Sequence, residues 1–167
     1  MAAPLIIVES EAKASVLQVQ LGEDVVVVAL PVAPAKASWR VPKDKLKRAR
    51  PRFDFSPLAA AKPVLDRLLT ARDREIYLAL ENNAHGEYWS WLLSGYLAEH
   101  SKGQLVPGRL RLLGLNRDEF RQSFRLVDTI REQAAIHAHL LLLLNSHLGK
   151  HLERLLEGQK VAIPFYN

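Results

Sequence analysis

The segment Leu5–Val8, followed at once by Glu9 and Ser10, constrains the fold of this chain more than any other feature. Four consecutive apolar residues, three of them β-branched, predict a short buried strand. Ser10 is a suitable N-cap for a helix that begins immediately after it, with Lys13 one turn inside. Ligands of open α/β sheets bind outside the carboxyl ends of the strands, beside helix N-termini that favour anions. We therefore expect Glu9 and Lys13 to lie at a binding site.

Strands and helices alternate along the rest of the chain. Apolar runs predict further strands over 25–30, 76–80 and 109–115; helices are expected over 11–20, 57–69, 86–100, 116–126 and 129–158, and a proline-bearing loop over 31–57. This alternation predicts an α/β fold with a mostly parallel sheet flanked by helices. We expect the α/β domain to span 1–115 and a helical extension to span 116–167.

Composition excludes several classes of protein. A chain of 167 residues with 49% hydrophobic and 25% charged residues has the balance of a globular domain and not of a disordered segment. Because the chain has no cysteine, it can form neither disulfides nor thiolate metal sites. We expect no secretory leader at the N-terminus, and the longest leucine run, 140–144, is too short to span a bilayer. We expect no membrane partner and a cytoplasmic location.

The positive charge is concentrated in one stretch. Residues 36–52 hold eight basic residues against a single acid, Asp44, so this stretch has a charge of +7. The rest of the chain has a charge of −2, which gives the net charge of +5. The eight are Lys36, Arg40, Lys43, Lys45, Lys47, Arg48, Arg50 and Arg52. Such a footprint predicts contact with a nucleic-acid backbone that is independent of base sequence and steeply salt-dependent. A solvated lysine-rich loop is the alternative interpretation.

Two motifs carry a family resemblance. Residues 5–14 read LIIVESEAKA, and residues 77–93 read YLALENNAHGEYWSWLL. The first is similar to the LVIVES strand that runs into P-A-K in the Toprim domain of type IA DNA topoisomerases, with Glu11 in place of the proline. The second resembles the family's YLATDxDREGEAIAWHL signature without a gap, and looser similarity continues at 115–120 and 148–150. The resemblance implies a Toprim-like fold, DNA as partner in single-stranded or duplex form, and a divalent-metal site.

The acids of that signature are altered. At the positions of the family's D-x-D-x-E acids this chain has Glu81, Asn83 and His85, so the formal charge of the site, with Glu9, falls from −4 to −2. The resemblance implies that these four residues are the metal ligands, and that Glu9 and Lys13 are the catalytic pair, with Lys13 at the phosphate. Mg²⁺ prefers carboxylate oxygens, so its binding is expected to be weakened. Mn²⁺ tolerates an imidazole ligand better and is the alternative cofactor.

The tyrosine nucleophile of type IA enzymes has no counterpart here. None of Tyr77, Tyr88, Tyr96 and Tyr166 lies in the sequence context of that nucleophile. The chain alone is therefore not expected to relax DNA. The resemblance instead implies a topoisomerase I-like Toprim protein that binds the DNA backbone, with weak or no catalysis.

Other interpretations remain open. Glu9 alone is compatible with a simple helix-capping role, and 81–85 with a polar turn. A small metal-dependent nuclease or phosphotransferase of the Toprim class is one alternative function. A non-enzymatic interaction module is another, because leucine lies on every side of the helix at 140–144. In that case 129–157 would bind another domain, another subunit or a second copy of the chain. His147 and His151 share one helix face but have no third ligand in the sequence.

Overall fold

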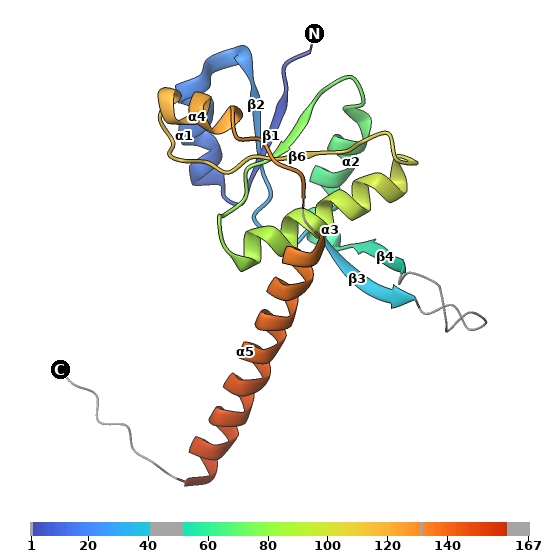
Figure 1. The fold of residues 1–167 in the computed structure, drawn as a ribbon, viewed down its shortest axis with the longest axis vertical. Coiled ribbons are helices and arrows are strands. Elements are labelled where there is room, and N and C mark those ends of the chain that lie inside the picture. Colours follow the sequence, from blue (N-terminus) through green and yellow to red (C-terminus); the bar gives the residue numbers. More distant parts are fainter. Residues whose placement is uncertain (1, 41–51, 131, 160–167) are drawn as a thin grey trace, which may run out of the picture.

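The chain folds around a four-stranded parallel sheet (Figure 1). This computed structural model describes residues 2–40, 52–130 and 132–159. The strand order is β2-β1-β5-β6, with β1 at Leu5–Val8, β2 at Val26–Ala29, β5 at Ile76–Leu78 and β6 at Gly108–Arg109. Ile6 of β1 lies opposite Val27 on one side and Tyr77 on the other. The predicted parallel sheet is confirmed, although the strand expected over 109–115 reduces to two residues.

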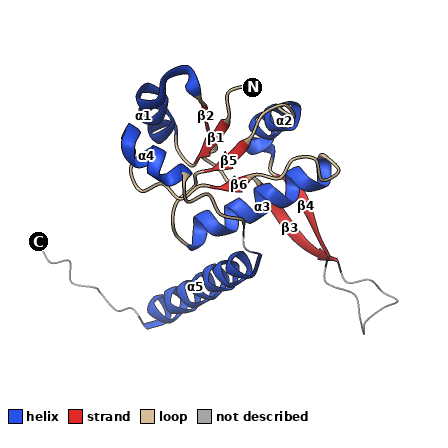
Figure 2. Cartoon of the chain, turned by 45° about the horizontal axis from the view of Figure 1, so that its top comes forward, coloured by secondary structure: helices blue, strands red, loops and turns tan. Residues whose placement is uncertain are grey.

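Helices cover both faces of this sheet (Figure 2). They are α1 (Glu11–Leu21), α2 (Lys62–Thr70), α3 (Ala84–His100) and α4 (Arg117–Phe124), with short 3-10 turns at Gly22–Asp24 and Ala59–Ala61. Alternate residues of β1 point to opposite faces. Ile6 therefore packs with Leu17 of α1 and Phe120 of α4, while Ile7 packs with the α2–α3 side. The α/β fold class is confirmed, and the boundary between 115 and 116 stays a prediction.

The loop predicted over 31–57 is wrong in part, because it contains an antiparallel hairpin. Strands β3 (Ala35–Arg40) and β4 (Arg52–Pro57) pair with each other and project from the body (Figure 1). Phe53 and Phe55 set their ring edges against Trp91 of α3, with ring centroids 4.9 and 5.2 Å apart. Phenylalanine at every second position is the pattern of a half-buried strand, which the flanking prolines and basic residues obscured.

The last described element is the 28-residue helix α5 (Glu132–Gln159), which confirms the helix expected over 129–158. Its first turns pack on α3 through Ala135 and Ala138, which are 0% and 4% exposed. Beyond these turns α5 leaves the body (Figure 1). Neither α5 nor any other helix in the described ranges combines the length and apolarity needed to cross a membrane.

Candidate functional site

The acid and the base predicted at the end of β1 meet as an ion pair. The Lys13 Nζ atom lies 2.7 Å from Glu9 Oε1, and each side chain is 20% exposed. The pairing follows from the local fold, because Ser10 caps α1 by accepting a hydrogen bond from the Lys13 backbone N–H at 3.3 Å. The cap starts the helix immediately after the strand and brings residue 13 back over residue 9.

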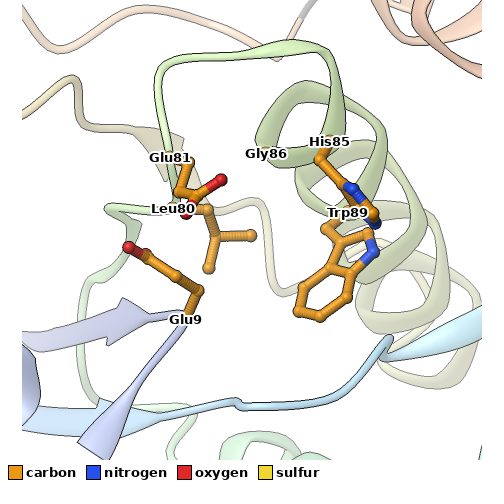
Figure 3. A pocket seen from close by; sticks show the side chains of 6 residues that line it. All are labelled: Glu9, Leu80, Glu81, His85, Gly86 and Trp89. Carbon is orange, nitrogen blue, oxygen red and sulfur yellow. The ribbon is translucent and has the colours of Figure 1, made fainter. Parts of the chain in front are cut away.

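A pocket of about 180 Å³ opens at the carboxyl ends of β1 and β5 (Figure 3). It is lined by Glu9, Leu80, Glu81, His85, Gly86 and Trp89. Glu9 and Glu81 lie on one side, and His85 and Trp89, both from α3, lie on the other. The structure thus brings three of the four predicted metal ligands to a single pocket at the edge of the sheet where ligands of α/β proteins bind.

Asn83, the fourth predicted ligand, caps a helix instead of lining the pocket. Its Oδ1 atom accepts a hydrogen bond from the Gly86 N–H at 2.9 Å, so α3 begins at Ala84 and not at Gly86 as expected. Its Nδ2 atom donates to Glu81 Oε2 at 2.6 Å. Asparagine is a preferred N-cap, and this role uses its side-chain oxygen.

Gly86 allows α3 to start against the loop that carries Glu81. A Cβ atom at position 86 would overlap the backbone of Glu81, including its carbonyl oxygen. Only glycine fits at position 86 without moving that loop. This gives a physical reason for the glycine in the second motif, residues 77–93. The first turn of α3 and the acidic loop are consequently held in close contact.

Arg109 organises the floor of the site, and the sequence analysis missed it. The side chain is 0% exposed and makes five hydrogen bonds. Its Nη1 atom donates to the carbonyl oxygens of Leu78, Leu80 and Leu110, its Nη2 atom to that of Glu81, and its Nε atom to Glu87 Oε1, at 2.7–3.1 Å. Burial lowers the pKa of Arg109, and the negative charge of Glu87 opposes that shift.

Glu87, which also matches the motif, joins two arginines. Its Oε1 atom lies 3.1 Å from Arg109 Nε and 3.3 Å from Arg111 Nη2. The Arg111 Nη1 atom in turn lies 3.1 Å from Asp128 Oδ2. This network ties α3 to β6 and to the segment after α4. No local pattern around Arg109 predicts its burial, because the alternation Arg-Leu-Arg at 109–111 would place leucine inside and both arginines outside.

The donor set does not match the acids that Mg²⁺ prefers. Within the ranges that the structure describes, no three His, Asp or Glu side chains are grouped so that they could hold a metal ion. Glu9 Oε1 already accepts a hydrogen bond from Lys13 Nζ, and Asn83 Oδ1 already accepts one from the Gly86 N–H. Glu9 Oε2 is buried and has no hydrogen-bond partner among the described residues. Metal binding by Glu9, Glu81, Asn83 and His85 stays a prediction.

The two ends of the basic stretch lie on the strands of the projecting hairpin. Lys36 is exposed on β3, and Arg40 pairs with Arg52 at the last register position of the hairpin. The predicted contacts Lys43, Lys45, Lys47, Arg48 and Arg50 lie outside the described residues. The role of the stretch in DNA binding stays a prediction.

Comparison with known proteins supports the fold. No protein-family model matches the chain, and no curated protein matches it. Among solved structures, full-length topoisomerase I from Thermotoga maritima is similar, with a TM-score of 0.57 and 21% sequence identity. The match covers 78% of this chain but only 22% of that topoisomerase. At this identity the likeness shows a Toprim-like α/β fold and leaves the activity to be proposed.

Proposed function

We propose that this protein binds the DNA backbone through its basic hairpin stretch, on a topoisomerase I-like Toprim fold with weak or no catalysis of its own. The observation that carries the proposal is the charge partition, +7 within 36–52 against −2 elsewhere. Lys36 and Arg40 of this stretch lie on β3 and Arg52 lies on β4, the two strands that project from the body (Figure 1). Lysine and arginine on such an arm reach phosphates without reading bases.

Weak catalysis follows from the contents of the pocket. The Glu9 carboxylate is neutralised by Lys13, and the family's second and third acids are replaced by Asn83 and His85. Two carboxylates, one of them already paired, offset the dehydration of Mg²⁺ poorly. We propose that Mg²⁺ binds weakly here and that Mn²⁺ is the better-tolerated ion.

The test is a fluorescence anisotropy titration with single-stranded and duplex oligonucleotides over a range of salt concentrations. It is run with Mg²⁺, with Mn²⁺ and with EDTA. We expect the logarithm of the affinity to fall linearly with the logarithm of salt concentration, with no added affinity from Mg²⁺ or Mn²⁺ over EDTA. Absence of binding at low salt would contradict the proposal.

A second candidate function is metal-dependent phosphodiester cleavage, as in a small nuclease or phosphotransferase. The observation that favours it is Glu9 Oε2, a buried acceptor without a partner among the described residues, beside a pocket that also holds Glu81. Cleavage that requires Mn²⁺, disappears in Glu9→Gln and persists in Glu11→Gln would establish this function. Glu11 is exposed on the next turn and serves as the matched control.

A partner-binding role for 129–157 is compatible with either function. Five leucines of α5 are 43–58% exposed, namely Leu140, Leu141, Leu143, Leu144 and Leu148. Exposed leucines concentrated on one helix are a feature of interaction surfaces. Another domain, another subunit or a second copy of the chain would each cover them.

A further inference from the structure

A second pocket lies where the hairpin, α3 and the first turns of α5 come together (Figure 1). It has a volume of about 210 Å³ and shares no lining residue with the acidic pocket of Figure 3. All three elements contribute to its wall, with Ala37 and Phe53 from the hairpin, Tyr88 and Trp91 from α3, and His139 from α5. Sites for drug-sized ligands have volumes of roughly 300–1,000 Å³, so this pocket has room for a single ring system.

Four of the described side chains that line this pocket carry an aromatic ring. The Tyr88 ring stacks on the His139 ring, with centroids 4.4 Å apart and ring planes inclined by 19°. Tyr88 also stacks on Trp91, with centroids 6.0 Å apart, and Phe53 sets its ring edge against Trp91. A wall built of ring faces and edges favours a planar, aromatic ligand over a flexible aliphatic one.

The same rings carry polar groups that are available to a ligand. Within the part of the chain that the structure describes, the Tyr88 hydroxyl, the Trp91 Nε1 atom and the His139 ring nitrogens form no hydrogen bond. None of these atoms is both buried and without a partner, so each of them reaches solvent. The Tyr88 hydroxyl donates and accepts hydrogen bonds, whereas Trp91 Nε1 only donates. The pocket therefore suits a flat ring with polar edges, and a nucleobase is such a ring.

The surrounding charge distinguishes between classes of ligand. An aromatic pocket can also hold an organic cation, but no Asp or Glu is among the described residues that line this one. Ala37 and Phe53 directly follow Lys36 and Arg52, the first and last basic residues of the stretch at 36–52. A ligand that enters the pocket thus lies beside a segment with a charge of +7, which repels a cation and attracts a polyanion.

We propose that this pocket binds an unpaired base of a DNA strand whose phosphates contact the basic stretch. The inference rests on the proposed DNA binding and adds a base contact to it. Neighbouring residues of a strand face opposite sides, so the exposed Lys36 lies on the face of the hairpin away from the pocket. A DNA strand that passes around the hairpin edge places phosphates on one face and a base on the other. Stacking on aromatic side chains beside a basic surface binds bases of any sequence.

Fluorescence anisotropy separates the base contact from the phosphate contacts. The protein is titrated with labelled oligothymidylate and with an abasic oligonucleotide of the same length. Both carry the same phosphates, so the slope of log affinity against log salt should be the same for the two. Affinity for the abasic strand should be about tenfold lower, because it lacks a base to stack in the pocket.

Two variants locate the base contact. His139→Ala removes one ring of the wall and should weaken oligothymidylate binding about fivefold while leaving abasic binding unchanged. His137→Ala is the matched control, since His137 is exposed on the same helix and does not line the pocket. Ala37→Leu fills the pocket without removing a ring and should act as His139→Ala does. Equal losses on both oligonucleotides would show an effect through the fold and would overturn the base contact.

Photocrosslinking tests the contact in the unaltered protein. An oligonucleotide with 5-iodouracil in place of thymine is irradiated in the complex, and the attached peptide is identified by mass spectrometry. We expect attachment to Phe53, Tyr88, Trp91 or His139, and crosslinks confined to other residues would overturn the proposal. Equal, salt-dependent binding of the two oligonucleotides would overturn the base pocket and leave the phosphate contacts standing. Absence of binding to both at low salt would overturn this proposal together with the proposed function.

Discussion

At the carboxyl ends of β5 and β6 a single buried guanidinium makes five hydrogen bonds, four of them to backbone carbonyls. Arg109 thereby holds in place the strand end from which Glu81 follows. A buried arginine is stable only when its donors and its charge are both satisfied, and Glu87 supplies the counter-charge. The position of the candidate site thus depends on a residue that does not line it.

Replacing Arg109 should destabilise the whole fold. Arg109→Met leaves the Glu87 carboxylate and several carbonyl oxygens without their buried donor, and we expect a loss of about 3–5 kcal/mol in the free energy of unfolding. Arg111→Met is the control, because Arg111 is 36% exposed and pairs with the same Glu87. It should cost no more than about 1 kcal/mol. Urea unfolding of both variants checks this, and equal losses would contradict it.

A tyrosine should make the protein sensitive to alkali. Burial raises the pKa of Tyr88, which stacks on His139 of α5 with ring centroids 4.4 Å apart. The folded state therefore holds the phenol proton more tightly than the unfolded chain. The resulting stability is fully present below pH 10, the ordinary tyrosine pKa, and is lost as pH rises through the folded pKa.

Tyr88→Phe should flatten that alkaline decline. The variant and the parent protein are compared by urea unfolding at neutral pH and at pH values above 10. We expect a shallower fall in the free energy of unfolding for the variant above pH 10, with residual slope from Tyr77 and Tyr96, whose pKa values burial also raises. An identical pH dependence in both proteins would refute the assignment to Tyr88.

At the scale of elements, the hairpin is held to α3 by aromatic contacts and by one side-chain hydrogen bond. Phe53 and Phe55 flank Trp91, and Glu99 Oε2 accepts a hydrogen bond from the Phe55 N–H at 3.1 Å. Gly95 of α3 provides the space for the Phe55 ring, since a Cβ atom there would overlap it. The hairpin is therefore a docked arm whose orientation depends on one face of α3.

Gly95→Ala should loosen the hairpin. Alanine favours a helix by up to about 1 kcal/mol over glycine, but crowding of the Phe55 ring should outweigh that gain and destabilise the protein by about 1–2 kcal/mol net. Under the DNA proposal, oligonucleotide affinity should fall as well. Gly149→Ala is the control, because a Cβ atom there meets open space and should stabilise α5. Thermal unfolding distinguishes the two, and changes of the same sign would contradict the docking argument.

At the scale of the whole molecule, the positive charge is confined to residues 36–52, and the rest of the chain is slightly negative. Attraction to a polyanion is then directed to one end of the molecule instead of being spread over its surface. The Toprim-like body presents its pocket at the carboxyl edge of the sheet, and α5 extends away from the body (Figure 2). Under the proposals made above, phosphate contact and pocket chemistry would belong to separate parts of the chain.

Charge removal at the arm should change the salt dependence of DNA binding. Replacing Lys43, Lys45 and Lys47 together by glutamine should reduce the slope of log affinity against log salt by about 3 if each contacts a phosphate. The control replaces Lys62, Arg67 and Arg72, which are exposed on and after α2, and removes the same charge. Anisotropy titrations measure both slopes, and equal reductions would indicate attraction by net charge alone.

Local patterns predicted much of this protein. The apolar run before Glu9 predicted a buried strand, and the prediction that Ser10 caps the following helix is confirmed by its hydrogen bond from the Lys13 N–H. The alternation of elements predicted a parallel sheet. The hairpin over 35–57 was missed because prolines and basic residues obscure its few apolar positions, which find their partners, such as Trp91 and Gly95 of α3, only in the tertiary structure.

The sequence by itself determined strands β1, β2 and β5, the position of Glu9 and Lys13 at a strand end, and the confinement of charge to one stretch, because each depends on residues within a few positions of one another. Only the tertiary structure decided that Arg109 fixes the Glu81 loop and that Asn83 caps a helix. Four of the five Arg109 hydrogen bonds join residues 22–31 positions apart. A buried donor could find many partners, and the packing of the whole chain decides which of them it meets, because no local sequence pattern does.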